Sequence, residues 1–186
     1  MKRVYVDTEY CYPGMLRGTP RPTSKDLRQI VQIAAVIVES DTGLEIDSFD
    51  QLVFPTYEKN VPEFFVELTG ITQKTIDNSA VTFKQALLDF VHFTNGLPIW
   101  TFDKDEEVLR QNCSYIDMKW VFTEPFIRVK ALLPSWNIDA NEYSSGTLFK
   151  AAGIKMDGHV HNALHDVRSM SQAIRVFENN NKNKIT

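Results

Sequence analysis

The chain has 186 residues and a mass of 21.3 kDa, with 43% hydrophobic and 24% charged residues. This size and composition predict a single globular domain with a substantial core, and they exclude a collagen-like or low-complexity chain. The net charge is -4 and the pI is near 5.6, which argues against a protein that coats nucleic acid through bulk positive charge. Any contact with nucleic acid must therefore be local.

The sequence carries no pattern typical of a membrane or secretory segment. Its most apolar run, residues 30–38, is far shorter than the roughly 20 residues of a membrane span. Asp7 and Glu9 interrupt the N-terminal stretch where a signal peptide would be apolar, and Cys11 and Cys113 show no metal-binding or redox spacing. We therefore expect a cytoplasmic protein with no membrane partner, whose oligomeric state the sequence does not indicate.

The first part of the chain predicts three strands. Residues 2–8 are rich in β-branched and aromatic side chains, and residues 30–39 and 44–54 form two further strand patterns separated by a turn. Because side chains alternate between the two faces of a strand, Asp7 and Glu9 should share one face. Two neighbouring carboxylates on a covered face would need a positive partner.

The rest of the chain alternates between helical and strand patterns. Helices are expected at residues 62–68, 73–77, 83–93, 105–113, 148–152 and 162–179, and short strands at residues 97–102 and 126–129. This order predicts an α/β fold in which helices cover a sheet. One domain should span residues 1–178, followed by a tail at residues 179–186 that we expect to be disordered.

Acidic residues recur in three separate segments. Asp103 and Asp105 belong to an acidic cluster that follows the fourth strand, and Asp166 lies in the last helix. If these segments converge on Asp7 and Glu9, four carboxylates would match the charge of two divalent cations. Ligands that are all oxygen select hard ions such as Mg²⁺ or Mn²⁺, and two such ions are a known device for phosphoryl displacement.

A histidine near Asp166 is a candidate general base. The unperturbed pKa of a histidine is about 6.5, and His161 is expected in the loop before the last helix, where it could accept a proton from an attacking water. His159, His161 and His165 together allow a second interpretation, a zinc site. The oxygen ligands and the absence of a nearby cysteine favour the first, and His165 is then expected to be a packing or surface residue.

Four motifs in order resemble a known family. They read DTE at residues 7–9, LTGIT at 68–72, DxxxL at 105–109 and HNALHD at 161–166. This order resembles the DnaQ-like 3'-5' exonucleases of the DEDDh type, a branch of the RNase H-like fold, and within it the RNase T and Eri-type exoribonucleases. The resemblance spans almost the whole chain.

The resemblance implies a fold and an activity. The fold would be a five-stranded mixed sheet ordered 3-2-1-4-5, with the second strand antiparallel and helices on both faces. The activity would be two-metal hydrolysis of single-stranded nucleic acid from a free 3' end, releasing nucleoside 5'-monophosphates. RNA and DNA remain open as substrates.

The resemblance also implies roles for individual residues. The metal ligands would be Asp7, Glu9, Asp105 and Asp166. His161 would be the general base, and Leu68 and Thr69 would lie near the 3'-terminal nucleotide. The segment that leads into the DxxxL motif reads WTFDKD, which departs from many relatives and leaves Asp103 as an alternative to Asp105.

The position of each acid favours Asp105. Asp103 suits a helix N-cap, with Glu106 three residues later as in a capping box. Asp105 instead shares a helical face with Val108 and Leu109, which should pack on the sheet. Asp105 is thus expected to be the ligand and Asp103 a structural residue.

A different class of protein competes with the enzyme. A non-catalytic RNase H-like module that binds nucleic acid or protein could keep the fold and lose the chemistry. Such a module would be free to lose a ligand or the histidine, yet all five residues of the expected site are present. A metal-dependent 3'-5' exonuclease is therefore the preferred hypothesis.

Overall fold

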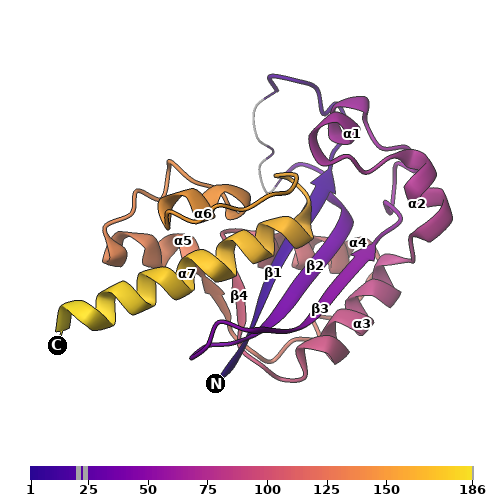
Figure 1. Ribbon diagram of the computed structural model, residues 1–186. Coiled ribbons are helices and arrows are strands. Elements are labelled where there is room, and N and C mark those ends of the chain that lie inside the picture. The colour runs from indigo at the N-terminus through magenta and orange to yellow at the C-terminus, as the bar shows by residue number, and fades with distance from the viewer. Residues whose placement is uncertain (20–21, 23–24, 186) are drawn as a thin grey trace.

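The computed structural model describes residues 1–19, 22 and 25–185 and contains one five-stranded sheet within them (Figure 1). The strands are β1 (Lys2–Cys11), β2 (Gln29–Glu39), β3 (Glu45–Leu52), β4 (Ile99–Thr101) and β5 (Phe126–Arg128). Their order is β3-β2-β1-β4-β5, in which β2 is antiparallel to its neighbours and β4 is parallel to both β1 and β5. The mixed sheet that the resemblance implied is confirmed.

The helices follow the predicted order with small shifts of their ends. They are α1 (Glu63–Thr69), α2 (Gln73–Ser79), α3 (Phe83–Thr94), α4 (Asp105–Tyr115), α5 (Val129–Leu132), α6 (Leu148–Ala151) and α7 (Ala163–Ile185), with 3-10 turns η1 (Leu133–Trp136) and η2 (Ser145–Thr147). The elements α5, η1 and η2 were not predicted, because three or four residues are too few to show a helical period. The last helix, α7, continues to Ile185, beyond the helix end predicted at residue 179.

Two layers of helices cover the sheet, one on each face. Val4 and Val6 pack with α3 and α4 in one core cluster, whereas Tyr5 packs with α5, α6 and α7 in another. Figure 1 shows α7 crossing the sheet on the side opposite to α3 and α4. A third cluster joins α1 and α2 to the end of β1 at Cys11. The strand alternation predicted for β1 therefore separates two apolar cores.

The topology brings the ends of three elements together. Since β1 and β4 are parallel and pair Val6 with Thr101, their carboxyl ends lie at the same edge of the sheet. The helix α4 begins at Asp105, just beyond β4, and α7 packs on the opposite face of the sheet, across β1 and β2. The acids of three distant segments are therefore carried by elements that meet at the carboxyl end of β1.

Strand β3 forms one edge of the sheet and is polar along its outer part. Its first four residues are exposed, and its sequence includes Glu45, Asp47 and Asp50. Glu45 accepts two hydrogen bonds from Arg168 of α7, at 2.7 and 2.9 Å.

Among the described residues, none of the helices combines the length and apolar character that a membrane crossing requires.

Candidate active site

The first two acids lie on one face of β1, as the alternation of the strand predicts. Asp7 and Glu9 are 7% and 9% exposed, and both belong to the face on which α7 packs. Asp166 lies in the first turn of α7 and is 2% exposed. The structure thus brings Asp166 into the neighbourhood of the two strand acids.

The buried carboxylates raise one another's pKa. Burial, and then the negative charges of Asp105, Asp166 and Glu9, raise the pKa of Asp7 well above its usual range. The pKa of Glu9 rises for the same reasons, through burial and the charges of Asp166 and Asp105. Burial also raises the pKa of Asp105 and Asp166, although hydrogen bonds to each oppose the effect. The four acids form one electrostatic unit.

Asp105 is held through both of its oxygens. Its Oδ1 accepts hydrogen bonds from the backbone N–H and the hydroxyl of Thr8, at 3.1 and 2.8 Å, and its Oδ2 accepts one from the hydroxyl of Thr101. Thr8 alternates with Asp7, so its side chain lies on the α4 face of the sheet. Helix α4 thus packs on the sheet, as predicted, but on the face opposite to the one that carries Asp7 and Glu9. Asp105 reaches them from the carboxyl end of β4.

Asp103 has a different environment from Asp105. It is half-exposed and forms an ion pair with Lys130 of α5, at 3.3 Å between Nζ and Oδ2. The residue that precedes α4 is Lys104, which makes no side-chain cap. The predicted capping role of Asp103 was therefore wrong, because α4 begins at Asp105, one residue later than that role requires.

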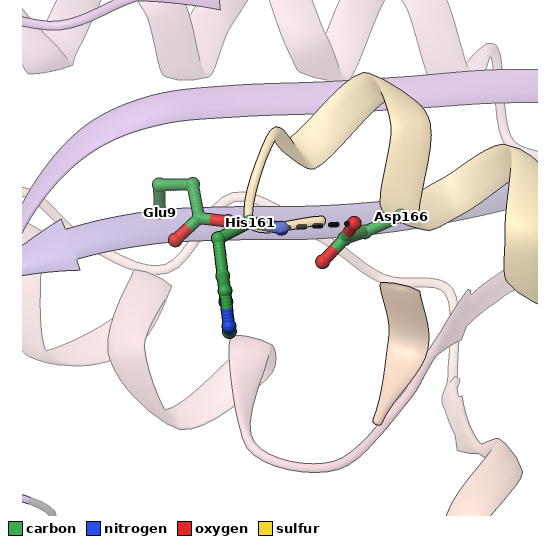
Figure 2. A group of neighbouring side chains, drawn as sticks. All are labelled: Glu9, His161 and Asp166. Atoms are coloured by element: carbon green, nitrogen blue, oxygen red, sulfur yellow. Dashed lines mark hydrogen bonds between the residues drawn. The ribbon is translucent and has the colours of Figure 1, made fainter. Parts of the chain in front are cut away.

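His161 lies in the loop that leads into α7, as predicted. Its backbone N–H donates to Oδ1 of Asp166 at 3.3 Å, and Figure 2 shows its side chain beside Glu9 and Asp166. One potential ligand atom of each of these three residues lies within 4.8 Å of the others. The φ of His161 is 72°, a left-handed conformation that is uncommon for a residue other than glycine and is often found at functional sites.

The three histidines near the site have separate partners. His159 bonds through Nε2 to the carbonyl oxygen of Leu68 at 2.9 Å, whereas His165 bonds through Nδ1 to Oδ1 of Asp166 at 3.1 Å. Of these three histidines, only His161 belongs to the group of possible metal ligands found among the described residues. His165 is more than the packing or surface residue we expected, since it is buried and contacts an acid of the cluster.

The predicted substrate residues lie on α1, beside the His161 loop. Thr69 is buried, and its hydroxyl donates to the carbonyl oxygen of Phe65 at 2.9 Å and accepts from the N–H of Ile71 at 3.1 Å. The bond between His159 and Leu68 joins α1 to the segment that carries His161. The substrate role of Leu68 and Thr69 remains a prediction.

Two polar residues at the site had no signal in the sequence. The hydroxyl of Ser145, in η2, bonds to Asp7 and lowers the pKa of that carboxyl against the stronger effects that raise it. Gln32, paired with Glu9 across β1 and β2, accepts the N–H of Ala163 at the start of α7 at 3.1 Å. Only the folded chain brings these side chains to the acids.

Comparison with known proteins agrees with this geometry. The model of the RNase_T family, described as exonuclease, matches residues 6–173. The chain belongs to this exonuclease family. The matched range contains every residue of the predicted ligand set and the predicted base, so the relationship expected from the motifs is confirmed.

Curated relatives and solved structures add to the family assignment. The chain is 23% identical over 173 residues to the 3'-5' exoribonuclease 1 of Mus musculus and 24% over 166 residues to that of Rattus norvegicus; each match covers 82% of this chain. Each match covers 48% of the relative, so this chain spans about half of their length. The nuclease domain of 3'hExo, a DEDDh member bound to rAMP, has a TM-score of 0.82 at 19% identity, covering 96% of this chain and 92% of that one. Cell-death related nuclease 4 has a TM-score of 0.77 at 15% identity, with coverage of 96% and 64%. These structures show a shared fold.

The repulsion among the acids predicts a pH dependence of stability. A carboxyl whose pKa is higher in the native than in the unfolded protein destabilises the fold once it ionises, by about 1.4 kcal/mol for each pKa unit. In a metal chelator, Asp7→Asn should therefore be more stable than the unsubstituted protein at high pH. Urea unfolding should show this advantage shrinking as the pH falls toward the ordinary carboxyl pKa near 4.

A matched control is available in the same region. Asp103→Asn removes a half-exposed carboxylate paired with Lys130, so its effect should stay within about 1 kcal/mol and should not be a gain that grows with pH. An Asp7→Asn protein no more stable than the unsubstituted one at high pH would contradict the repulsion inferred for the cluster.

Proposed function

We propose that this chain is a metal-dependent 3'-5' exonuclease that hydrolyses single-stranded nucleic acid from a free 3' end to nucleoside 5'-monophosphates. The observation that carries the proposal is the convergence of four buried carboxylates beside a histidine in a member of an exonuclease family. A binding module would gain nothing from burying four acids that raise one another's pKa. The non-catalytic alternative is therefore the weaker hypothesis.

The donor set fits divalent cations. Asp7, Glu9, Asp105 and Asp166 offer oxygen ligands alone, and their mutual repulsion would be relieved by positive charge. We propose two ions, Mg²⁺ or Mn²⁺, held by these four residues. Such ions, when bound, offset the charge of the phosphate and lower the pKa of an attacking water.

His161 is proposed as the general base. Its place in the loop before α7 keeps it beside Glu9 and Asp166, and its own N–H bond to Asp166 fixes the backbone from which the imidazole projects (Figure 2). A neutral imidazole accepts a proton from water near pH 7. In this role, the chain itself removes the proton from the attacking water.

The terminal nucleotide is proposed to lie against α1, at Leu68 and Thr69. The support is the bond between the Leu68 carbonyl and His159, which places α1 next to the loop of the proposed base. Among structural neighbours, one complex concerns 3'-end recognition of a histone mRNA stem-loop and another is E. coli ExoI with single-stranded DNA. Both RNA and DNA are therefore proposed as substrates to be tested.

A cytoplasmic location is also proposed. The two cysteines, Cys11 and Cys113, are buried and free, and burial raises the pKa of their thiols to about 12 and about 11. Thiols that stay protonated are unreactive. Such cysteines suit a reducing compartment.

The activity is tested on oligonucleotides of RNA and DNA labelled at the 5' end. With Mg²⁺ or Mn²⁺ the products should form a ladder that shortens from the 3' end, with release of 5'-mononucleotides. A chelator should abolish turnover, and a blocked 3' terminus should resist it. Cleavage of circular single strands would instead show an endonuclease and contradict the proposal.

The second acidic motif is tested by a pair of variants. Asp105→Asn should reduce turnover by at least about 10²-fold, because it removes a buried ligand of a site whose parts act together. Asp103→Asn should leave most of the activity, since its carboxylate pairs with Lys130. Turnover measured at saturating Mg²⁺ decides between the two residues, and an inactive Asp103→Asn beside an active Asp105→Asn would reverse the assignment.

The base is tested by the pH profile of His161→Ala. This change should lower kcat by about 10²-fold or more and remove the acid limb of the profile, since the imidazole must be neutral to accept a proton. His92→Ala, an exposed histidine on α3, serves as the control and should behave like the unsubstituted enzyme. If His161→Ala lost Mn²⁺ affinity as strongly as Asp166→Asn, His161 would be a metal ligand instead of the base.

A further inference from the structure

The Asp166 carboxylate is contacted by two hydrogen-bonding groups that lie outside the expected ligand set. Its Oδ1 accepts the backbone N–H of His161 at 3.3 Å and faces Nδ1 of His165 at 3.1 Å. When Asp166 is ionised, as a metal ligand must be, it can only accept, and the tautomer of His165 with the hydrogen on Nδ1 then donates to it. Both donors act on the same oxygen.

The imidazole ring of His165 is itself held in place by close packing on two sides. It is 8% exposed and meets the edge of Phe149 from α6, with ring planes at 88° and centroids 6.2 Å apart. On another side lies Gly158, where a Cβ atom would overlap Cδ2 of the ring and lie 3.0 Å from Nε2. The imidazole therefore has little freedom to turn away from Asp166.

A second glycine makes room for the carboxylate. A Cβ atom at Gly146, in η2, would lie 2.5 Å from Cγ and 2.6 Å from Oδ2 of Asp166. Gly146 is not among the glycines with a positive φ, so its backbone suits any residue and only the lack of space excludes a side chain. A capping box between Ser144 and Thr147 holds the turn in place.

We infer that His165 and Gly146 are positioning residues that fix the orientation of Asp166 as a metal ligand. The imidazole holds Oδ1, and the glycine leaves the space that the carboxylate fills, so the carboxylate keeps one orientation beside Glu9 and His161. This inference rests on the proposed metal-dependent function. Hydrogen-bonded partners of a ligating carboxylate typically change metal affinity or activity about 10–100-fold when they are replaced.

Two substitutions separate the donor of His165 from its ring. His165→Phe keeps an aromatic ring, one atom larger than imidazole, but loses the Nδ1 donor, whereas His165→Asn loses the ring but can place its amide N–H₂ where Nδ1 was. Calorimetric titration of the metal-free protein with Mn²⁺, without nucleic acid, should show about 10-fold weaker binding or more for His165→Phe. His165→Asn should bind Mn²⁺ nearer to the unsubstituted protein.

Kinetics supply a readout that a purely structural defect would not produce. For His165→Phe, the Mn²⁺ concentration giving half-maximal turnover should rise, while turnover at saturating Mn²⁺ should recover most of its value. Gly146→Ala should shift the same concentration upward, because its Cβ displaces the carboxylate. His92→Asn, on the opposite face of the sheet, should change neither quantity.

The outcomes separate this inference from the proposed function. Unchanged Mn²⁺ affinity in His165→Phe, or equal loss in His165→Asn and His165→Phe, would overturn the positioning role even if the enzyme degrades nucleic acid. An unsubstituted protein that binds no Mn²⁺ would overturn it as well. Conversely, weakened Mn²⁺ binding in His165→Phe, with no hydrolysis by the unsubstituted protein, would support the positioning role and refute the exonuclease activity.

Discussion

Repulsion among four buried carboxylates is the constraint on which this structure depends. Each negative charge makes ionisation of the others less favourable, and burial removes the water that would otherwise screen them. Left to itself, such a cluster would move apart or take up protons. The fold must therefore hold the acids in place with rigid elements. These are β1 at the centre of the sheet and the first turns of α4 and α7.

The groups that surround the acids are mostly neutral donors. Thr8 and Thr101 donate to Asp105, Ser145 bonds to Asp7, and two N–H groups face Asp166. Neutral donors orient a carboxylate without cancelling its charge, so the site keeps its negative potential for a cation. Lys130, a cation near this edge of the sheet, is instead paired with Asp103. The neutral donors thus orient the carboxylates, and the carboxylates themselves supply the negative charge of the site.

Much of the fold and the meeting of the acids could be predicted because the signals are local and periodic. Alternation placed Asp7 and Glu9 on one face, and the order of the motifs indicated the sheet topology. The cap assigned to Asp103 could not be checked in this way, because the start of a helix is set by tertiary packing as well as by propensity. Neither His165 nor Gly146 has a sequence signal, because their contacts join segments that are distant in the sequence. Gly146 lies against Asp166, and His165 packs on Phe149.

The extent of α7 shows a related limit. Its polar C-terminal part has no apolar stripe to mark it as helical, yet the helix continues to Ile185. Polar residues without a period are compatible with either helix or coil. The side of α7 that packs on the sheet is predictable from its apolar spacing, whereas its length is not.

The acidic edge strand has a consequence for how the protein behaves at high concentration. An edge strand exposes unpaired backbone groups, which invite another strand to add and so promote aggregation. In β3, Glu45 is paired with Arg168, but the exposed Asp47 and Asp50 would set like charges against each other if two copies met edge to edge. A second group of acids, separate from the four at the site, thus opposes strand addition along this edge.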